Sequence, residues 1–331
     1  MSNRVYDDKL YNSDHKDMYL SQIESSASKT IYERILKRAA FIEEQVSKDL
    51  YNFNIEEVEK LLFFLAPTTF SSSSDALYHI NQYINWGIQQ GLRTDNINPL
   101  LGIRNDENYV RKFIDQTNKY YFTEAEINDM INRIMNFQDS GIIQCLYEGM
   151  WGHQYSEILS LVKSDIHRNS NVIEVRNLLS NGDTERRSIK VSSKLMNMLY
   201  SASEETEYTR NNGDFSPTLR TSKEIKLVEN EYVFRNGDMN TKEYGIAPSH
   251  LITRRLKNIS RWFDYTHLKA MNIRKSGMIK MARDLIQISN KFEREEISEI
   301  FNQFNIDYTS TTRITKDFLN IETIRALYPE E

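Results

Sequence analysis

The chain has 331 residues and a net charge of −5; 39% of its residues are hydrophobic, 11% are aromatic, and Gly and Pro are scarce. This length allows two domains, and the composition predicts an ordered, mainly helical protein. The single cysteine, Cys145, excludes an internal disulfide framework, and no apolar run approaches the roughly 20 residues that cross a membrane. Because the N-terminus is polar and unlike a signal peptide, we expect a cytoplasmic protein that does not contact a membrane.

Residues 18–101 carry apolar side chains at helical spacing, which predicts a small helical domain after a flexible N-terminus over residues 1–17. The expected helices lie over residues 18–50, 58–65 and 75–90. The serine run Ser71–Ser74 has the composition of a loop, and Ser74 is placed to cap the helix that follows. Residues 102–119 are polar and are expected to link this domain to a second one.

The second domain is expected over residues 120–331. Thr123 and Glu126 have the spacing of a capping box, in which a hydroxyl and a carboxylate accept hydrogen bonds from the amides at a helix start. Strand-like runs at residues 172–175 and 188–191 predict an antiparallel hairpin. We also expect helices around residues 195–200 and from 248 onward, a polar connection over 203–221, and a short strand over 232–234. The predicted fold class is therefore mainly α with a small antiparallel sheet.

Basic charge gathers in residues 242–283, where ten Lys or Arg face only two acidic residues. The local charge is +8, so the rest of the chain sums to −13. A helix that opens at Pro248-Ser249 places two sets of side chains on separate faces, the polar set His250, Arg254, Lys257 and Arg261 and the apolar set Ile252, Leu256, Ile259 and Phe263. Ordinary solvated faces mix charges of both signs, so this segment favours a surface that binds a polyanion.

Five segments, in this order along the chain, resemble motifs of the tyrosine recombinase (phage integrase) family. They are Tyr83–Gly91 with Asn98–Leu100, Thr123–Ile127, Gly152–Leu161 with Asp165-Ile166, Met271–Met278, and Asp307–Thr315. The resemblance covers about residues 18–320. It implies a SAM-like helical core-binding domain followed by a mainly helical catalytic domain with a small sheet, the two clamping DNA between them.

The catalytic positions that the resemblance identifies are largely substituted. Recombination needs cations around a pentavalent phosphorane and a tyrosine placed in line to attack the phosphorus. The expected arginine, two histidines and nucleophilic tyrosine fall on Gln154, Met271, Ile306 and Thr315. The hairpin lysine has no candidate, because no lysine lies between Lys163 and Lys190. Arg274 alone remains, so the resemblance implies a protein that is not an enzyme.

Retained architecture without catalysis implies a sequence-specific binder of double-stranded DNA, and resembles the integrase-derived repressors of SPbeta-type temperate phages. Such a protein would occupy operator sites, maintain lysogeny, and be nucleoid-associated in a bacterial host. The expected phosphate contacts are Arg254, Lys257, Arg274 and Lys275, and the expected base-reading helix holds His250, Thr253 and Arg254. The complete candidate set is His250, Thr253, Arg254, Arg255, Lys257, Arg261, Asn272, Arg274 and Lys275.

Two other functions remain open at this stage. The first is an active recombinase that uses a displaced nucleophile, for which Tyr308 is the nearby candidate. The second is an accessory protein that binds a recombinase rather than DNA. The C-terminal segment from Asn320 carries Ile321, Ile324 and Leu327 at helical spacing, and is expected to dock either on its own domain or on a neighbouring subunit of a homo-oligomer.

No pattern in the sequence indicates a cofactor or a metal. The six histidines include no pair at the i, i+3 or i, i+4 spacing, and Cys145 has no partner cysteine. No Gly-rich phosphate loop of the Walker or dinucleotide-binding type occurs. We therefore expect neither a bound cofactor nor a structural metal site.

Overall fold

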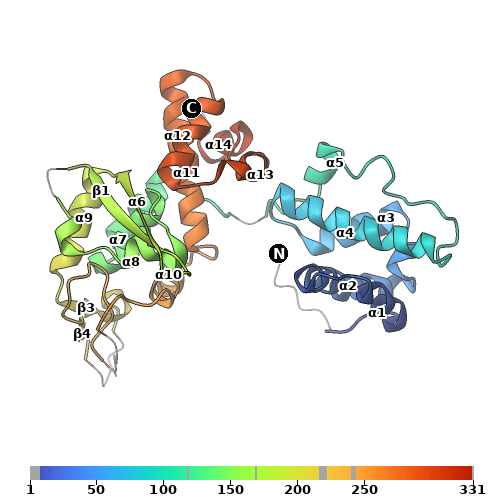
Figure 1. The fold of residues 1–331 in the computed structure, drawn as a ribbon, viewed down its shortest axis with the longest axis horizontal. Coiled ribbons are helices and arrows are strands. Elements are labelled where there is room, and N and C mark those ends of the chain that lie inside the picture. Colours follow the sequence, from blue (N-terminus) through green and yellow to red (C-terminus); the bar gives the residue numbers. More distant parts are fainter. Residues whose placement is uncertain (1–7, 118, 168–169, 216–221, 240–243, 330–331) are drawn as a thin grey trace. The chain divides into compact units, whose positions relative to one another are not determined.

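The computed structural model describes residues 8–117, 119–167, 170–215, 222–239 and 244–329. The chain divides into two compact units, Met1–Asn118 and Lys119–Glu331 (Figure 1). Each unit has its own hydrophobic core. No helix in the described part of the chain is long and apolar enough to cross a membrane.

The first unit is a bundle of helices around one aromatic-rich core. Its elements are α1 (Ser13–Ser21), α2 (Ser26–Val46), a 3₁₀ turn (Leu50–Asn52), α3 (Ile55–Leu65), α4 (Phe70–Gln89) and α5 (Glu107–Arg111). Phe53, Leu61 and Ile84 are fully buried there. Tyr83 is also fully buried, and its ring stacks on that of Trp86 with the centroids 5.4 Å apart. The small helical domain expected from the periodicity is confirmed.

The expected flexible N-terminus is wrong for residues 13–17, because α1 begins at Ser13. Lys16 on this helix is fully buried. Its Nζ lies 2.6 Å from Glu43 Oε1 and 3.0 Å from Asp49 Oδ2. A buried ammonium needs such partners; Glu43 holds α1 against α2, and Asp49 holds it against the start of the 3₁₀ turn. Residues 1–7 of the expected terminus lie outside the described residues.

The serine run is helical and does not form the expected loop, because α4 begins at Phe70. Thr69 and Ser72 form a reciprocal cap, in which Ser72 N donates to Thr69 Oγ1 at 3.1 Å and Thr69 N donates to Ser72 Oγ at 3.0 Å. This cap satisfies the free amides at the helix start one turn earlier than Ser74 would have done.

The expected linker is wrong over residues 107–113: residues 107–111 form α5, and the segment packs onto the first unit. Val110 and Phe113 are both buried in its core. Ser73 Oγ donates to the Val110 carbonyl at 2.7 Å. These two apolar side chains therefore anchor a segment whose overall composition is polar.

The second unit is mainly helical with two small antiparallel sheets. Its helices are α6 (Glu124–Arg133), α7 (Phe137–Tyr147), α8 (Ser156–Leu159), α9 (Ser193–Glu204), α10 (His250–Phe263), α11 (Ala270–Ser289), α12 (Arg294–Phe304), α13 (Thr311–Asp317) and α14 (Ile321–Leu327). Its strands are β1 (Val172–Leu178), β2 (Thr184–Lys190), β3 (Glu207–Thr209) and β4 (Glu224–Lys226). Thr123 and Glu126 form the predicted capping box at the start of α6.

The predicted hairpin is confirmed as β1 paired with β2, in a register that sets Ile173 opposite Ile189. A second pair, β3 with β4, was not predicted, and β3 lies within the segment expected to be a polar connection. The expected strand over residues 232–234 is wrong. Tyr232 makes only an isolated bridge to Val162, while Val233 and Phe234 are buried as core residues.

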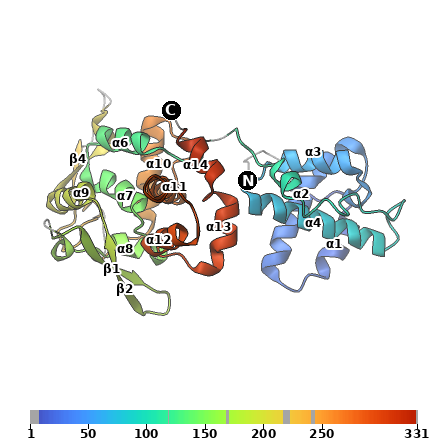
Figure 2. The same ribbon diagram turned by 90° about the horizontal axis from the view of Figure 1, so that it is seen from above.

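Helix α11 runs through the core of the second unit. Figure 2 looks along this helix and shows α7, α10 and α12 around it. A Cβ atom at Gly277 would lie 1.8 Å from the Tyr147 carbonyl oxygen, so the absence of a side chain there lets α7 and α11 pack closely. The second half of α11 builds a further core with α12 and α14, which includes Ile300, Phe301 and Ile324.

The C-terminal segment docks on its own unit, which is one of the two expected arrangements. Ile324 is buried, and the Tyr328 hydroxyl accepts a hydrogen bond from Glu124 N at 3.0 Å.

Candidate nucleic-acid interface

Helix α10 separates an apolar face from a cationic face, as its sequence predicts. Leu251, Ile252, Leu256 and Ile259 are buried against the unit. The side chains of His250, Thr253, Arg254, Lys257 and Arg261 are exposed. The helix ends at Asp264, whose φ of 56° is left-handed and whose N–H donates back to Ser260 O. The buried face thus fixes the orientation in which the cationic face meets solvent.

Arg255 is a correction to the candidate set, because its side chain points into the protein and is only 5% exposed. Its Nη1 donates to the Gln138 carbonyl and its Nη2 to the Arg235 carbonyl, both at 2.8 Å. Its Nε lies 3.4 Å from Asp139 Oδ1, and that carboxylate is fully buried. Arg255 therefore neutralises an internal charge and is not available to a DNA phosphate.

The exposed cations of α10 make no salt bridges among the described residues, whereas Lys280 and Arg283, later in the basic segment, do. Within the described residues, Arg254 and Lys257 make no hydrogen bond or salt bridge, and Arg261 contacts only the neutral Asn258 side chain at 3.3 Å. In contrast, Lys280 Nζ lies 2.6 Å from Asp284 Oδ2, and Arg283 pairs with Asp284 and Glu124. The positive field of the segment is therefore concentrated on α10. Lys242 lies outside the described residues.

The three candidates on α11 are recessed and already hydrogen-bonded or packed. Arg274 lies over the Trp151 ring at 5.0 Å and donates to the Phe304 carbonyl, and burial lowers the pKa of its guanidinium to about 10. The Lys275 ammonium lies 4.6 Å from the centroid of the Phe318 ring, and burial lowers its pKa. Asn272 Nδ2 donates to the His267 carbonyl at 2.9 Å.

The positions matched to catalytic residues do not form a cluster of cations around a nucleophile. Gln154 and Met271 are exposed, and Ile306 packs on the core formed by α11, α12 and α14. The Thr315 hydroxyl donates to the Thr311 carbonyl at 2.9 Å. The candidate substitute nucleophile, Tyr308, bonds through its hydroxyl to Ser298 Oγ at 2.8 Å and Asn302 Oδ1 at 2.9 Å.

Sequence reasoning missed Arg187 on β2, because the hairpin was searched only for a lysine. Its guanidinium makes two 2.7 Å contacts to the two carboxylate oxygens of Glu157. It also donates to the carbonyls of Gly149 and Gln303, each at 3.0 Å. The bidentate pair is partly buried and ties the hairpin to α8, and the bond to Gln303 ties it to the end of α12. In the described part of the chain, no group of three or more His, Cys, Asp or Glu could hold a metal ion.

Two family models cover most of the chain. Residues 121–329 match the model described as MrpR, C-terminal catalytic domain, and residues 10–89 match MrpR, N-terminal core-binding domain. The chain belongs to the MrpR family. The order of these two domains confirms the recombinase-like, two-domain architecture expected from the sequence motifs.

A full-length relative of this MrpR-family chain is the SPbeta prophage-derived uncharacterized protein YopR of Bacillus subtilis (strain 168). The two are 29% identical over 328 residues, which is 97% of this chain and 98% of YopR. Among solved structures, XerA recombinase gives a TM-score of 0.42 at 14% identity, covering 96% of this chain and 95% of its own. A lambda integrase dimer bound to a COC' core site gives 0.43 at 10% identity, covering 92% and 93%.

Proposed function

We propose that this protein is a non-catalytic, sequence-specific binder of double-stranded DNA that represses phage genes and maintains lysogeny. The observation that carries the proposal is the outer face of α10, where Arg254, Lys257 and Arg261 are exposed and make no salt bridge among the described residues. Cations that are not neutralised internally can replace the counterions of a DNA backbone. A prophage-derived relative is in keeping with a phage regulator.

The phosphate contacts are tested by removing charge from α10. DNA fragments tiled across the genome that encodes the chain first identify a bound site by footprinting, and fluorescence anisotropy then gives the affinity at several salt concentrations. Arg254→Ala combined with Lys257→Ala should weaken binding and flatten the salt dependence by about two units of log–log slope, one per lost phosphate contact. Unchanged affinity and slope would refute the assignment.

The matched control removes the same charge from another surface of the second unit. Lys223 and Lys226 are exposed at and beside β4, so Lys223→Ala with Lys226→Ala changes the net charge equally. This control should leave the salt slope unchanged. If both double variants lose the same affinity, the effect is one of overall charge, and α10 is not a specific interface.

Base reading is assigned to the exposed polar residues at the start of α10. Thr253 is exposed, and its hydroxyl donates to the His250 carbonyl at 3.1 Å. Thr253→Ala and His250→Ala should each relax the preference at one position of the operator, at a cost of about 1 to 3 kcal/mol, with the salt slope preserved. Binding to a randomised operator library, sequenced before and after selection, measures this change.

The absence of catalysis is tested with a nicked suicide substrate, which traps any covalent adduct. We expect no adduct, because Arg274 is half-buried and bonded to Phe304, and the matched nucleophile position is Thr315. The alternative is a recombinase that uses Tyr308, which is about half exposed. A covalent adduct that disappears in Tyr308→Phe would establish that alternative and overturn the proposal.

Two further elements of the proposal have separate tests. A reporter gene fused to the footprinted promoter should be silenced by the wild-type chain and expressed again in the presence of the Arg254 and Lys257 double variant.

The alternative of an accessory protein that binds only a recombinase predicts a different result, in which no DNA fragment is shifted at physiological salt. The inner face of the C-terminal segment docks on its own unit, so self-association would use its outer face. Ile321→Asp, at a position 38% exposed, should then reduce the mass on DNA measured by sedimentation.

A further inference from the structure

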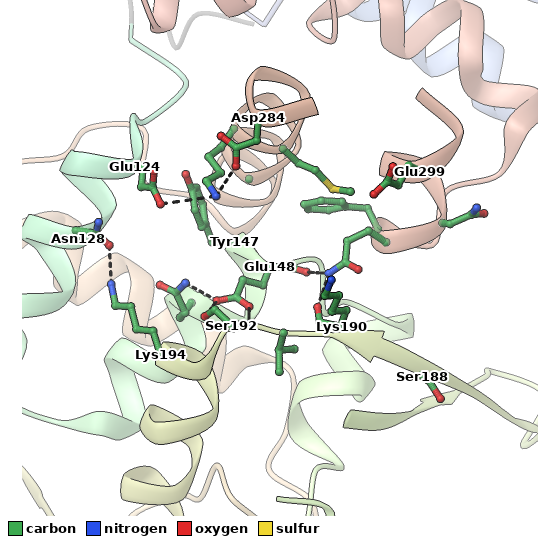
Figure 3. A pocket seen from close by; sticks show the side chains of 18 residues that line it. Glu124, Asn128, Tyr147, Glu148, Ser188, Lys190, Ser192, Lys194, Asp284 and Glu299 are labelled. Atoms are coloured by element: carbon green, nitrogen blue, oxygen red, sulfur yellow. Dashed lines mark hydrogen bonds and ion pairs between the residues drawn. The ribbon is translucent and has the colours of Figure 1, made fainter. Parts of the chain in front are cut away.

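A cavity of about 810 Å³ lies within the second unit, on a different set of residues from the outer face of α10. Its walls come from α6, α7, the segment from β2 into α9, and helices α11 and α12 (Figure 3). Met281, Phe304 and Val191 supply apolar surface, while lysines and carboxylates contribute the polar lining. This volume is in the range of sites that hold small organic ligands.

Gln144, on the α7 wall, has a buried acceptor without a partner. The residue is 6% exposed, and its Nε2 donates to Glu148 Oε1 at 2.6 Å. That bond fixes the orientation of the amide, because the opposite orientation would set two oxygens against each other. Gln144 Oε1 then has no hydrogen-bond partner in the described part of the chain. A buried acceptor of this kind is satisfied by a ligand that donates an N–H or O–H.

Most other charges of the cavity are already paired. Glu148 also accepts bonds from the amide and hydroxyl of Ser192, each at 2.6 Å. The Lys280 ammonium lies 2.6 Å from Asp284. Three charged side chains keep open hydrogen-bonding capacity among the described residues: Lys190 and Lys194, on the segment from β2 into α9, and Glu299 on α12.

Lys194 and Glu299 lie on opposite sides of the cavity (Figure 3). Lys194 Nζ donates to Asn128 Oδ1 at 2.5 Å, which leaves two of its N–H groups, and burial lowers its pKa. Glu299 is exposed and makes no hydrogen bond or ion pair within the described residues. The cavity therefore offers a donor at one side, an acceptor at the other, and apolar surface between them.

We infer that this cavity binds a short linear peptide with free termini. Its carboxyl end accepts bonds from Lys194, a backbone N–H donates to Gln144 Oε1, and its amino group faces the Glu299 carboxylate. Apolar side chains of the peptide pack against Met281 and Phe304. A nucleotide fits less well, because four carboxylates outnumber the three lysines that line the cavity, and a polyamine would meet the ammonium groups of Lys190 and Lys194. This inference goes beyond DNA binding and does not depend on it.

The experiment is affinity selection of the full chain against the complete set of tripeptides with free termini, with retained peptides identified by mass spectrometry. The same set with N-acetylated peptides, nucleoside monophosphates and spermidine are run in parallel. We expect retention of a subset of free tripeptides and loss of at least ten-fold in affinity on N-acetylation. No retained tripeptide, or retention only of nucleotides or spermidine, would overturn the inference.

Variants then locate the site by titration calorimetry with a retained peptide. Lys194→Met and Gln144→Leu, which preserve side-chain size, should each weaken binding about ten-fold or more, because each leaves a ligand group unpaired. Lys226→Met on β4 is the matched control and should bind as the wild type does. Circular dichroism confirms folding, and Lys194→Met decides the matter if Gln144→Leu does not fold. Equal affinity in wild type and Lys194→Met places the peptide elsewhere and refutes the site.

Discussion

Two neighbouring arginines on α10 are predicted to have opposite roles, and substituting each by methionine separates them. Arg254 is exposed on the outer face, whereas Arg255 is buried beside Asp139. Methionine preserves helix propensity and most of the side-chain length while removing the charge. Arg255→Met is expected to destabilise the fold, and Arg254→Met is expected to weaken DNA binding while leaving stability within about 0.5 kcal/mol.

The loss of unfolding free energy in Arg255→Met follows from Asp139, whose carboxylate loses its ion-pair partner. Asp139 is fully buried, and the Tyr208 hydroxyl at 2.8 Å would be its remaining donor. To avoid an uncompensated charge at pH 7, Asp139 must take up a proton; for an unfolded pKa of about 3.9 this costs about 4 kcal/mol. Breaking a buried ion pair from one side costs a similar amount, about 3 to 5 kcal/mol.

The pH dependence gives a second signature. Burial raises the pKa of Asp139, and Arg255 is the first interaction that lowers it, so the variant has the higher pKa. A folded pKa above the unfolded one adds stability at low pH that is lost as the pH rises. The deficit of Arg255→Met should therefore be smallest at low pH, where Asp139 is protonated in both proteins, and widen as the pH rises by up to about 1.4 kcal/mol per pH unit.

Urea unfolding followed by circular dichroism at pH 4.5, 5.5 and 7 measures the stability deficit, and anisotropy at a concentration where each variant is folded measures DNA affinity. If Arg255→Met costs less than about 1 kcal/mol at pH 7 and loses as much DNA affinity as Arg254→Met, the assignment of the inner and outer faces is wrong.

Three further predictions concern the scaffold. Burial raises the pKa of Glu43 to about 7, so stability from this group is lost as the pH rises from 5 to 7, and Glu43→Gln should flatten that decline in urea unfolding. Gly277→Ala sets a methyl group against the Tyr147 carbonyl and should cost more than about 3 kcal/mol in unfolding free energy, whereas Gly245→Ala, which meets nothing within 4 Å, should be neutral. Thr123→Ala removes the cap of α6 and should lower the thermal stability by about 1 kcal/mol, measured by calorimetry.

The periodicity of α10 was sufficient to predict its two faces, because the spacing of apolar residues records which side is buried. The same periodicity held the signal for Arg255, which lies three residues after Ile252 and four before Ile259, on the apolar stripe. Its positive charge favoured a DNA contact when only the local segment was considered. The partner that buries it, Asp139, lies on α7, and no local pattern connects the two.

Other residues were predicted wrongly for the same reason, because the residues that bury them are far away in the sequence. Lys16 and Phe113 lie in segments whose average composition is polar, and each is buried by contacts with other helices. The open acceptor of Gln144 depends on side-chain geometry that no sequence pattern specifies. In contrast, the capping box at Thr123 involves residues three apart, and the sequence predicted it correctly.

The two inner guanidinium groups show why the α10 face is the stronger candidate for phosphate binding. Arg187 donates to the Gln303 carbonyl and Arg274 to the Phe304 carbonyl, both at the C-terminal end of α12. A helix C-terminus carries partial negative charge, so both cations are stabilised there without a nucleic acid. A phosphate at Arg274 must compete with that carbonyl, whereas one at Arg254 or Lys257 has no competitor among the described residues. Removing Arg274 should therefore cost more in stability than in salt slope, the reverse of the order expected for α10.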